Sequence, residues 1–573
     1  MTAFDPTLPF VLLDDASPGG IARLFTGMRE TIVATCASEV AAALTRLRAT
    51  PGPRAGFVAF DAGYALEPAL ADLAPPGSDG LPLIWFGVFA RVEPFDPAEL
   101  PAGPARVAAP VPDIDPARFT AQVDAILGHI AAGDLYQANL TFAATVATSG
   151  HPLALYCRLR AAAAAPHGAL VHTGDAWILS FSPELFFTLA GGRLTTRPMK
   201  GTAPRGLTAA ADDTAAAALA ADPKNRAENL MIVDLLRNEL ARVAVPGSVA
   251  VPALFAVERY PTLLQMTSTV TATTAEDAVT VLTALFPCGS VTGAPKIAAM
   301  AAIARIEGGA RGVYTGSIGA IDADGDATFN VAIRTLVLAP GQPARIGLGA
   351  GIVADSVAAA EWHECLAKGG FLTRRPPPAI IETMRVADGI VPLLDRHLAR
   401  AAATARFLGT TFAVAIAGEV AAAAATAGDA RLRLLIAPSG AWAIEVGPLP
   451  PPVPGPVSVA LVPLPVATDD WRLRHKTTDR AFYDDARRAA GAFEAVFVTP
   501  DGALTEGSFT SVFVIRGGAL LTPPAALGLL PGVLRAELFA TGRAREAMLT
   551  ANDLADGFFI GNALRGLIAA RLV

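Results

Sequence analysis

The sequence contains few cysteines, and none lies near another: Cys36, Cys157, Cys288 and Cys365. This spacing fits neither a metal-binding motif nor a disulfide framework, so we expect ordinary reduced thiols. The sequence also lacks an excess of basic residues, because its formal net charge is -7. We therefore expect no nucleic-acid partner, and small molecules or proteins are the expected partners.

No uninterrupted apolar run is long enough to span a bilayer, although 52% of the residues are hydrophobic. The first residues, MTAFDPTLPFVLLDD, are acidic and lack the basic region and the cleavage site of a secretory signal. We therefore expect a cytoplasmic protein without a membrane partner.

Three consecutive prolines, at positions 376 to 378, mark the clearest break in the chain. Consecutive prolines stiffen a connector. A chain of 573 residues is also too long for one compact core, so more than one domain is expected. Both sides of the break mix strand-like and helix-like patterns, which predicts an α+β fold class. The predicted divisions are a domain over 1–373, with a leading region over 1–110 and a core over 120–373, a linker over 374–379, and a smaller domain over 380–573.

Two segments place carboxylates on predicted helices. In DPKNRAENLMIVDLLRNEL the initial Asp-Pro pair is suited to begin a helix, which places Glu228 about two turns in, among apolar residues. A second helix, predicted to begin at a capping Ser356, carries Glu361, Glu364 and Lys368 on one face. Three glutamates from two helices are suited to hold a hard cation such as Mg²⁺. Solvated helix faces with a Glu364–Lys368 pair are the alternative.

Glycine-rich segments and one arginine are suited to bind anions. FPCGSVTGAPK turns into a predicted helix, so amides near Thr292 and Gly293 are suited to receive a carboxylate. IGLGAGIVADS fails as a dinucleotide loop because no helix follows directly, which leaves a close approach to a ligand or a bulged strand. Arg334 lies in an apolar strand and needs an anion, either a structural carboxylate or a substrate.

A set of segments over residues 120–373 resembles the chorismate-utilising enzymes, which include anthranilate, isochorismate and aminodeoxychorismate synthases. The segments are YQANLTF, SFSPELFF, RPMKGTAPRG, DPKNRAENLMIVDLLRNEL, GSVTGAPK, RGVYTGSIG, NVAIRT and GAGIVADS with EWHECLAK. The resemblance implies a sandwich of two β-sheets with outer helices. It also implies that chorismate binds together with Mg²⁺ held by Glu228, Glu361 and Glu364.

Lys200, in RPMKGTAPRG, distinguishes activities within this family. From these ten residues alone, a surface lysine is the simpler interpretation. The corresponding segment, however, resembles Pro-Ile-Ala-Gly-Thr in anthranilate synthases and Pro-Ile-Lys-Gly-Thr in aminodeoxychorismate synthases. The resemblance implies that Lys200 adds to C2 of chorismate, that Glu184 is the general acid for loss of the C4 hydroxyl, and that ammonia enters at C4. A desolvated lysine beside a cation has the lowered pKa that this role needs.

The resemblance also implies a set of substrate contacts and a partner. By the resemblance, Gln137 takes the place of a lysine that activates water in isochorismate synthases. The amide of Gln137 cannot act as that base. The other implied substrate-binding residues are Gly201, Thr202, Thr292, Tyr314, Arg334, Gly349, Ala350, Gly351 and Lys368. No cysteine lies in a Gly-x-Cys-x-Gly turn, so we expect a separate glutamine amidotransferase subunit to supply ammonia. Cys288 and Gln265 depart from the glycine and the histidine of relatives.

Residues 380–573 resemble fold-type IV pyridoxal phosphate enzymes, which include branched-chain and D-amino acid aminotransferases and aminodeoxychorismate lyase. The segments that carry the resemblance are IETMRV, DRHLARAAATARFLG, HKTTDRAFYDDAR, LTEGSFTSVFV, LLPGVLR and GNALRG. The resemblance implies a smaller domain of two α/β subdomains, and a homodimer formed through this domain is one assembly that it allows.

Lys476 and Glu506 are the implied functional pair of this second domain. Either residue alone is more often a surface charge. The resemblance implies that Lys476 carries pyridoxal 5′-phosphate and that Glu506 faces its pyridine nitrogen. The residues implied to bind its phosphate are Arg400, Gly532, Val533, Asn562 and Ala563. Ser511 departs from the asparagine of many relatives.

Fusion of the two domains favours synthesis of 4-aminobenzoate for folate. The first domain would aminate chorismate to 4-amino-4-deoxychorismate, and the second would remove the C4 proton through Lys476 and eliminate pyruvate. Three alternatives stay open: a synthase fused to an amino acid aminotransferase, a first domain of the anthranilate synthase type, and a non-catalytic scaffold.

Overall fold

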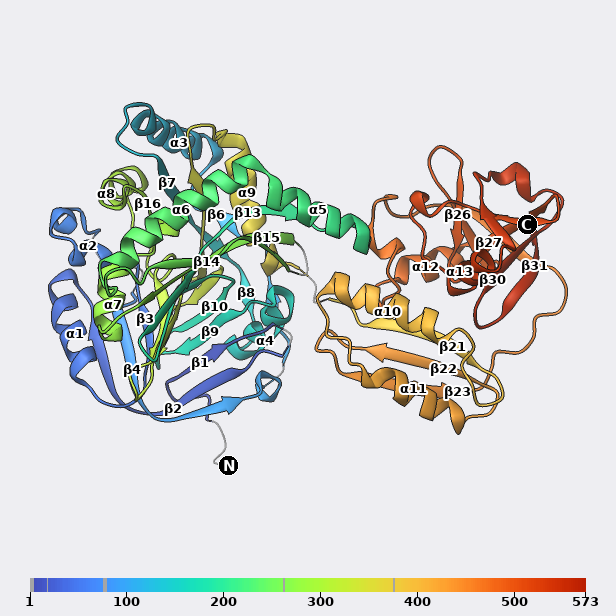
Figure 1. Cartoon of the computed structure of the whole chain (residues 1–573), viewed down its shortest axis with the longest axis horizontal. Helices are drawn as coiled ribbons and strands as arrows, with labels where there is room; N and C mark the ends of the chain where they lie inside the picture. Colours follow the sequence, from blue (N-terminus) through green and yellow to red (C-terminus); the bar gives the residue numbers. More distant parts are fainter. Residues whose placement is uncertain (1–4, 18, 76–79, 102, 261–262, 375–376) are drawn as a thin grey trace. The chain divides into compact units, whose positions relative to one another are not determined.

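The computed structural model describes residues 5–17, 19–75, 80–101, 103–260, 263–374 and 377–573. The chain forms two compact units (Figure 1). The first unit comprises residues 1–203 and 216–376, and the second comprises residues 204–215 and 377–573. The domain and linker bounds given above stay a prediction, and two residues of the predicted linker, Arg375 and Pro376, lie outside the described residues.

The first unit is built on a long antiparallel series of strands. Its strands up to residue 190 are β1 (Phe10–Asp14), β2 (Ala22–Ala34), β3 (Arg54–Val58), β4 (Ile84–Phe95), β6 (Val111–Pro112), β7 (Gln137–Val146), β9 (His167–His172), β10 (Trp177–Ser182) and β11 (Leu185–Ala190). The later strands are β12 (Arg193–Arg197), β13 (Met199–Pro204), β14 (Ala250–Arg259), β15 (Leu263–Thr273), β16 (Gly293–Ala294), β17 (Ser317–Ile321), β18 (Ala327–Asn330), β19 (Thr335–Leu338) and β20 (Ala344–Ile352). A separate ribbon pairs β5 (Arg106–Val107) with β8 (Thr148–Ser149).

The series follows the order β14-β15-β12-β11-β18-β17-β3-β4-β2-β1-β9-β10-β19-β20-β7. Side chains from β3 and β4, such as Phe57 and Trp85, share one buried cluster with Val171 of β9 and Ile178 of β10. Strands from the two halves of the series therefore pack face to face, as in a sandwich. This arrangement confirms the expected two-layer α+β fold.

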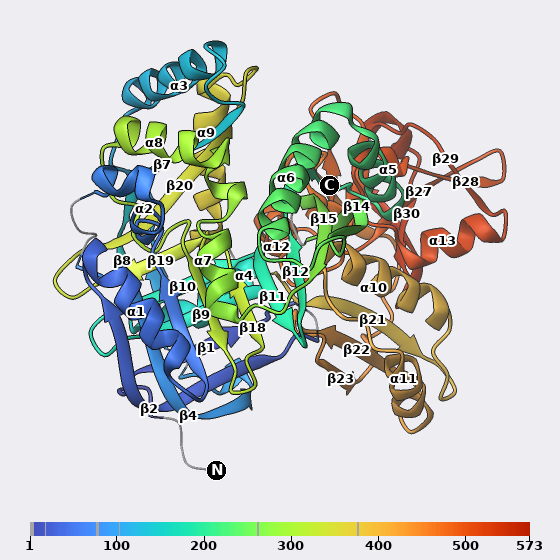
Figure 2. The ribbon, with the colours of Figure 1, turned by 60° about the vertical axis from the view of Figure 1, so that its left-hand side comes forward.

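Helices cover both outer faces of this sandwich (Figure 2). One outer cluster contains residues of α1, α6 and α7, and the other contains residues of α3, α4, α8 and α9. The helices are α1 (Ala37–Ala49), α2 (Ala62–Leu66), α3 (Pro116–Ala131), α4 (Pro152–Ala163), α6 (Pro223–Ala241), α7 (Ala278–Leu285), α8 (Lys296–Glu307) and α9 (Ala358–Gly369). Helix α5 (Ala209–Ala221) is divided between the two units. The predicted start of α6 is confirmed, because the Asp222 side chain accepts from the Asn225 amide and Pro223 occupies the first turn.

The second unit contains two α/β parts, as expected. In the first part, α10 (Leu394–Leu408) and α11 (Ala415–Ala425) share a core with the antiparallel sheet of β21 (Ile380–Val386), β22 (Ala430–Ile436) and β23 (Trp442–Gly447). The second part has α12 (Ala481–Ala490), α13 (Val533–Ala540) and a sheet in the order β26-β25-β24-β31-β30-β27-β28-β29. Its strands are β24 (Val457–Pro463), β25 (Glu494–Val498), β26 (Leu504–Gly507), β27 (Ser511–Arg516), β28 (Ala519–Thr522), β29 (Ala544–Glu546), β30 (Phe558–Asn562) and β31 (Gly566–Leu572).

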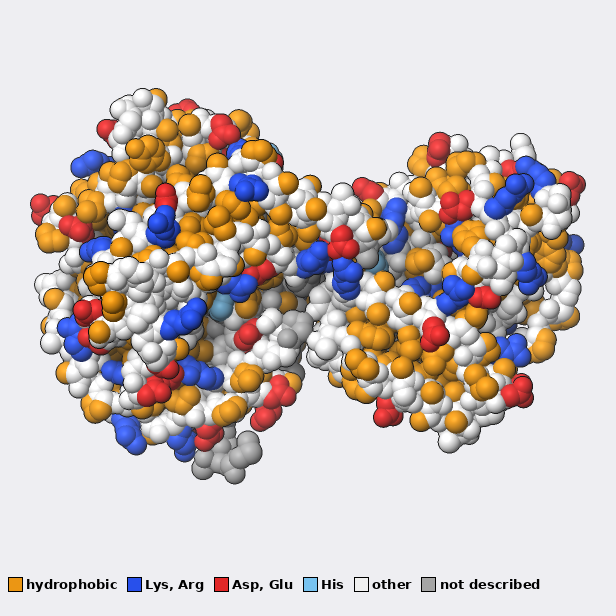
Figure 3. All heavy atoms as spheres, viewed as in Figure 1, with side chains coloured by type: hydrophobic (Ala, Val, Ile, Leu, Met, Phe, Trp, Pro, Cys, Tyr) orange, Lys and Arg blue, Asp and Glu red, His pale blue; other side chains and the backbone are white. Residues whose placement is uncertain are grey.

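Charges of both signs are interspersed on the face of the molecule drawn in Figure 3. That face therefore carries no continuous basic surface. None of the helices in the described part of the chain has the length and apolar character needed to cross a membrane.

Helix α6 carries Glu228. The buried apolar face of α6 is predicted to hold this helix in place. Leu236 is 1% exposed, whereas Leu230 on the same helix is 46% exposed. We expect Leu236→Ala to lower the free energy of unfolding of the first unit by about 2–5 kcal/mol, because it removes buried methyl groups and leaves a cavity. Leu230→Ala is the matched control, with an expected change below about 0.5 kcal/mol in urea unfolding. Equal effects would contradict this packing of α6.

Candidate active sites around Lys200 and Lys476

The backbone of Lys200 is fixed by α6 and β15. Its carbonyl accepts a hydrogen bond from Asn229 Nδ2 at 3.4 Å, and Asn229 is itself fully buried. The next residue, Gly201, has φ of +91°, which favours glycine, and its carbonyl accepts from Gln265 Nε2 at 2.9 Å. Ser268 Oγ donates to Asn229 Oδ1 at 2.6 Å. The sequence around Lys200 therefore holds this lysine in one defined place.

The Lys200 amine lies among other charged groups. Burial, followed by the Lys368 ammonium, lowers the pKa of Lys200, and the carboxylates of Glu184 and Glu228 act in the opposite direction. A lowered pKa raises the unprotonated fraction of an amine at neutral pH, which is the nucleophilic form. Lys200 is therefore not a freely solvated surface lysine.

Glu184 lies in the turn between β10 and β11 and is 5% exposed. Burial raises the pKa of Glu184 to about 7, although a hydrogen bond with Ser290 and the charges of Lys200 and Lys368 act to lower it. Its Oε1 has no hydrogen-bond partner among the described residues. A carboxyl group with this pKa is partly protonated at neutral pH and can donate a proton.

Strand β20 leaves space beside the lysine. A Cβ at Gly351 would lie 3.1 Å from Lys200 Nζ and 3.0 Å from Gln137 Nε2. The Nε2 of Gln137 is buried without a hydrogen-bond partner in the described part of the chain. Lys368 Nζ donates to the Gly349 carbonyl at 2.9 Å. The structure therefore brings Gln137, Gly349, Gly351 and Lys368 to Lys200.

The three glutamates expected to bind Mg²⁺ lie in this region, on α6 and α9. Burial raises the pKa of Glu228. Glu361 Oε1 accepts from Ser356 Oγ at 2.7 Å, and Glu364 pairs with Lys368 at 2.8 Å. Carboxylate oxygens suit Mg²⁺, so the donor chemistry fits the ion. Among the described residues, however, no three His, Cys, Asp or Glu side chains are gathered closely enough to hold a metal.

One local prediction in this region is wrong. Ser356 does not cap α9, because the helix begins at Ala358 and Val357 stands at the cap position. The Thr292 amide donates to the Gly289 carbonyl at 3.3 Å, and Gly293 pairs with β7 as part of β16. A contact of Thr292 with the substrate stays a prediction.

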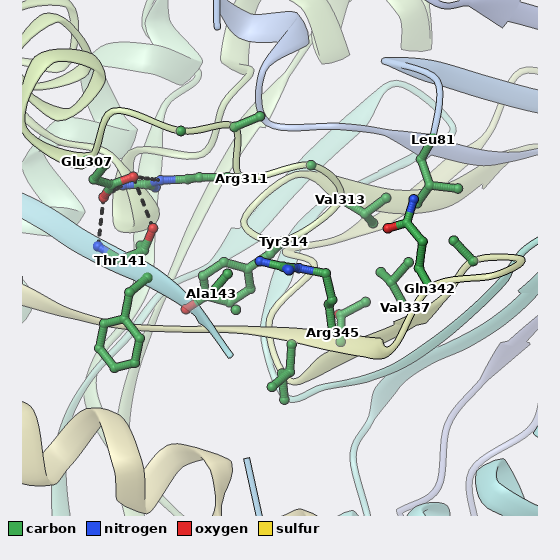
Figure 4. A pocket seen from close by; sticks show the side chains of 18 of the residues that line it. Leu81, Thr141, Ala143, Glu307, Arg311, Val313, Tyr314, Val337, Gln342 and Arg345 are labelled. Atoms are coloured by element: carbon green, nitrogen blue, oxygen red, sulfur yellow. Dashed lines mark hydrogen bonds and ion pairs between the residues drawn. The ribbon is translucent and has the colours of Figure 1, made fainter. Parts of the chain in front are cut away.

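Three other predicted substrate contacts are not brought to the lysine amine. The Ala350 side chain is fully buried in the outer core with Ile352 and Leu348. Thr202 is exposed, and its hydroxyl donates to Gln265 Oε1 at 3.2 Å. Tyr314 lines a separate cavity (Figure 4). Their roles in binding chorismate stay predictions.

Arg334 precedes β19 and has φ of +52°, a strained conformation for a residue other than glycine. Burial, followed by the charge of Arg374, lowers the pKa of Arg334. It lines a small hollow together with Met199, the neighbour of Lys200, and with Gln265. Among the described carboxylates none forms a salt bridge with Arg334. The structural-carboxylate alternative has no partner among the described residues, and pairing of Arg334 with a substrate anion stays a prediction.

Lys476 is the corresponding lysine of the second unit. Burial, followed by the charges of Arg480 and Arg400, lowers the pKa of Lys476 to about 7. Its carbonyl accepts from the Ile381 amide at 3.0 Å, which ties it to β21. A buried amine that is half unprotonated near neutral pH is suited to bond to an aldehyde cofactor.

Glu506 is 6% exposed at the end of β26. Burial raises the pKa of Glu506 to about 7, although a hydrogen bond donated by the Tyr483 hydroxyl acts to lower it. Glu506 Oε2 also accepts from the Leu530 amide at 3.1 Å. A carboxyl group poised in this way can share a proton with a ring nitrogen.

The residues expected to bind the cofactor phosphate surround the start of α13. Arg400 donates two hydrogen bonds to Glu382, at 2.8 and 2.6 Å, and its Nη1 donates to the Pro531 carbonyl at 3.1 Å. A Cβ at Gly532 would lie 2.7 Å from Ser511 Oγ, so glycine allows the Ser511 side chain to approach the backbone there. Amides at a helix N-terminus favour a phosphate, and the site therefore fits pyridoxal phosphate.

The Asn562 side chain has a local role in this region. Its Oδ1 accepts from the amides of Leu564 and Arg565 at 3.1 and 2.9 Å, and its Nδ2 donates to the Phe509 carbonyl at 3.2 Å. These bonds shape the turn that contains Ala563. A direct contact of Asn562 and Ala563 with phosphate stays a prediction.

Two family models match the chain. Residues 96–374 match the model described as chorismate binding enzyme, and residues 379–573 match amino-transferase class IV. The chain carries a chorismate binding enzyme domain followed by a class IV aminotransferase domain.

Relatives of the chorismate binding domain include synthases of two kinds. Aminodeoxychorismate synthase component 1 of Salmonella typhimurium is 44% identical over 41% of this chain and 52% of that protein. Anthranilate synthase component 1 of Streptomyces coelicolor is 43% identical over 44% of this chain and 50% of that protein. The chain thus spans about half the length of these curated relatives.

A solved structure supports the fold of this domain. Anthranilate synthase component I from Streptococcus pneumoniae TIGR4 has a TM-score of 0.53 and 26% sequence identity, covering 65% of this chain and 94% of that chain.

Sequence reasoning missed several groups that support these sites. Asn229 and Ser290 in the chorismate binding domain, and Tyr483 and Glu382 in the class IV domain, contact the residues singled out from the sequence. Asn229 directly follows Glu228 in the sequence, which was a readable signal for Asn229. The other three are brought into contact by tertiary structure, and their local sequence gives no sign of it.

The pKa of Lys476 predicts a pH-dependent stability. In the cofactor-free protein the unfolded lysine, with a pKa near 10.5, binds more protons than the folded one between about pH 7 and about pH 10. Stability therefore rises with pH across this window, and the cost of burying the ammonium is fully present below it. We expect the Tm advantage of Lys476→Met over the wild type to be largest at or below about pH 7 and to shrink towards about pH 10.

The exposed Lys224 offers a matched control for this measurement, because its side chain is 60% exposed. Lys224→Met should give no such trend. A Tm difference between Lys476→Met and the wild type that is constant with pH would contradict the lowered pKa.

Proposed function

We propose that the chorismate binding domain aminates chorismate to 4-amino-4-deoxychorismate and that the class IV domain converts this product to 4-aminobenzoate and pyruvate. Sequence identity does not choose between synthases, because relatives named for the two activities are 44% and 43% identical. The carrying observation is the Lys200 amine with its lowered pKa, next to Glu184 and the space at Gly351. A lysine that occupies C2 leaves C4 for ammonia.

The proposed amination has two balanced steps. The unprotonated Lys200 amine attacks C2 of the chorismate ring, both ring double bonds shift by one position, and the C4 hydroxyl leaves as water with a proton from Glu184. Ammonia then attacks C4, both double bonds shift back, and Lys200 leaves C2 as the free amine. The Glu184 pKa of about 7 supports the acid role, since a protonated fraction is present at neutral pH.

Two groups would bind the substrate carboxylates. Arg334, which has no carboxylate partner in the described part of the chain, would pair with one. Mg²⁺ held by Glu228, Glu361 and Glu364 would supply positive charge for the other. Ammonia would come from a separate glutamine amidotransferase subunit, and we place the proposed reaction in the cytoplasm.

In the class IV domain, pyridoxal phosphate bound to Lys476 would supply an electron sink for a carbanion at C4. The Lys476 amine, with a pKa of about 7, is suited to take up the C4 proton. Glu506 is suited to hold a proton at the pyridine nitrogen, and Arg400 with Gly532 and Val533 to bind the phosphate. Loss of pyruvate then leaves an aromatic ring.

The decisive experiment pairs two variants of the full chain. The wild type, given chorismate, ammonium, Mg²⁺ and pyridoxal phosphate, should release 4-aminobenzoate and pyruvate. We expect Lys200→Ala to reduce formation of aminodeoxychorismate by at least about 1000-fold while lyase activity on supplied aminodeoxychorismate persists. Lys476→Ala should accumulate aminodeoxychorismate without pyruvate. Liquid chromatography with mass detection identifies each product.

Three outcomes would contradict parts of the proposal. Near-normal amination by Lys200→Ala would remove its covalent role, and anthranilate as the product would assign the first domain to that synthase type. Continued 4-aminobenzoate formation by Lys476→Ala would mean that the class IV domain does not catalyse the lyase step. Amino transfer to a keto acid acceptor would then support the aminotransferase alternative.

The metal assignment predicts a specific change in Mg²⁺ dependence. We expect Glu228→Gln to raise the Mg²⁺ concentration for half-maximal amination by at least about tenfold, because even outer groups of metal sites have effects of this size. Asp234→Asn, on the same helix with a side chain 67% exposed, is the matched control. An unchanged Mg²⁺ dependence in Glu228→Gln would contradict the metal assignment. Glu228 would then be interpreted as a carboxylate on a solvated helix face.

A further inference from the structure

Arg433 is a charged side chain of the class IV domain that the proposed reaction does not use. It lies on β22, the central strand of the sheet β21-β22-β23. Among the described residues, none accepts a hydrogen bond from its side chain or forms a salt bridge with it. Its Nε is buried, whereas its two terminal nitrogens keep accessible surface. A guanidinium in such a place needs an anion, and its terminal nitrogens are open to one.

The register of the sheet places Arg433 on the same face as Lys476. Lys476 lies opposite Ile381 at the edge of the sheet, because the Ile381 amide donates to the Lys476 carbonyl at 3.0 Å within an antiparallel bridge. Arg433 lies opposite Thr383, two residues further along β21. Residues opposite each other across an antiparallel pair point to one face, as do residues two apart on a strand. Lys476 and Arg433 therefore share a face.

The opposite face of this sheet packs against α10 and α11. Met384, Leu432 and Leu434 directly neighbour residues of the first face along β21 and β22, and they share one buried cluster with residues of both helices. Successive residues of a strand point to opposite faces. The face that carries Lys476 and Arg433 is therefore not the one that fills this core, and it is the face on which a ligand of Lys476 would lie.

The strand residues of this face carry an excess of positive charge. Arg385 lies opposite Arg431, and Glu445 lies opposite Arg433, so all four side chains point to this face. Glu445 pairs with Arg431 at 3.0 Å and not with Arg433. One carboxylate thus accompanies three arginines. The charge of Arg433 reaches Lys476, since it acts to lower the pKa of that lysine.

The spacing of Lys476 and Arg433 fits a ligand with an amine at one end and a carboxylate at the other. Arg433 lies two strands away from Lys476, which is about 10 Å across the sheet, and two residues along it, which is about 7 Å. Both side chains are long, so their charged ends can contact opposite ends of one small ring. In 4-amino-4-deoxychorismate, one carboxylate lies on the ring carbon opposite the amine.

We propose that Arg433 binds the ring carboxylate of the substrate of the class IV domain, while the amine of that substrate lies at Lys476. The two terminal nitrogens of Arg433 suit a carboxylate, and charge-assisted hydrogen bonds of this kind are strong. The contact selects amines that carry a carboxylate over uncharged amines of the same shape. This inference rests on the proposed function for the identity of the substrate, whereas the contact with a carboxylate is measurable without the lyase reaction.

The test compares 4-aminobenzoate with 4-aminobenzamide, which has the same ring and amine and lacks the charge. Each is titrated into the cofactor-loaded full chain, and the absorbance of bound pyridoxal phosphate reports binding in the class IV domain. We expect the wild type to bind 4-aminobenzoate with a Kd below about 1 mM and at least about tenfold more tightly than the amide. Arg433→Met should lose this preference, and Arg433→Lys should keep part of it. Arg385→Met, at an exposed position on the same face, is the matched control and should keep it fully.

The kinetics of the lyase reaction separate substrate binding from a structural role of Arg433. On supplied aminodeoxychorismate, Arg433→Met should raise KM by at least about 30-fold and lower kcat by less than about threefold, because the ring carboxylate is bound equally in the ground and transition states. A fall in kcat with KM unchanged, or loss of bound cofactor, would assign Arg433 a structural role and overturn the inference. A change of oligomeric state on size-exclusion chromatography would assign it to an interface between copies and also overturn it.

The outcomes distinguish this inference from the proposed function. A wild type that releases no pyruvate but prefers 4-aminobenzoate, with the preference lost in Arg433→Met, would contradict the lyase assignment and support the contact. Normal lyase kinetics and an unchanged preference in Arg433→Met would overturn the inference and leave the lyase assignment intact. Equal affinity of the wild type for the two ligands, or no saturable change in absorbance up to about 10 mM, would overturn the inference as well.

Discussion

A partly buried amine is the constraint on which the architecture around Lys200 depends. An ammonium group loses hydration on burial, and a second ammonium on Lys368 raises that cost. The surroundings must therefore fix the lysine without fully neutralising it by a close ion pair. Asn229 holds the backbone from α6, and the glycine at 351 keeps β20 from filling the space beside the amine. The lysine stays accessible because these neighbours carry no bulk or charge there.

The two domains solve the same problem with different neighbours. Each contains a lysine with a lowered pKa and a carboxylic acid whose pKa burial raises to about 7, and in the class IV domain the charge of Arg480 acts on both groups. In the first domain Lys368 supplies the neighbouring positive charge, whereas Arg480 and Arg400 supply it around Lys476. Acids and bases with pKa values near neutrality exchange protons in both directions at low cost. Sites of this kind are suited to reactions in which a proton leaves and returns.

The sequence allowed prediction of the features that depend on local order. The Asp-Pro start of α6 and the α+β class follow from short-range rules, whereas Gln137, Gly351 and Lys368 were associated with Lys200 only through the family resemblance. The error at Ser356 is a choice between local partners. The Ser356 hydroxyl donates to the Glu361 side chain, five residues later, and the helix begins only at Ala358. A capping pattern in the sequence does not distinguish these two arrangements.

The separation of the three glutamates has a physical explanation. Carboxylates brought together without a cation repel one another, and burial adds a further cost, which is visible in the raised pKa of Glu228. Glu361 and Glu364 avoid this cost by turning to Ser356 and Lys368. A dianionic substrate would add more negative charge to the same region. Cation and substrate would therefore each make binding of the other more favourable, and the proposed site would be completed only when both are present.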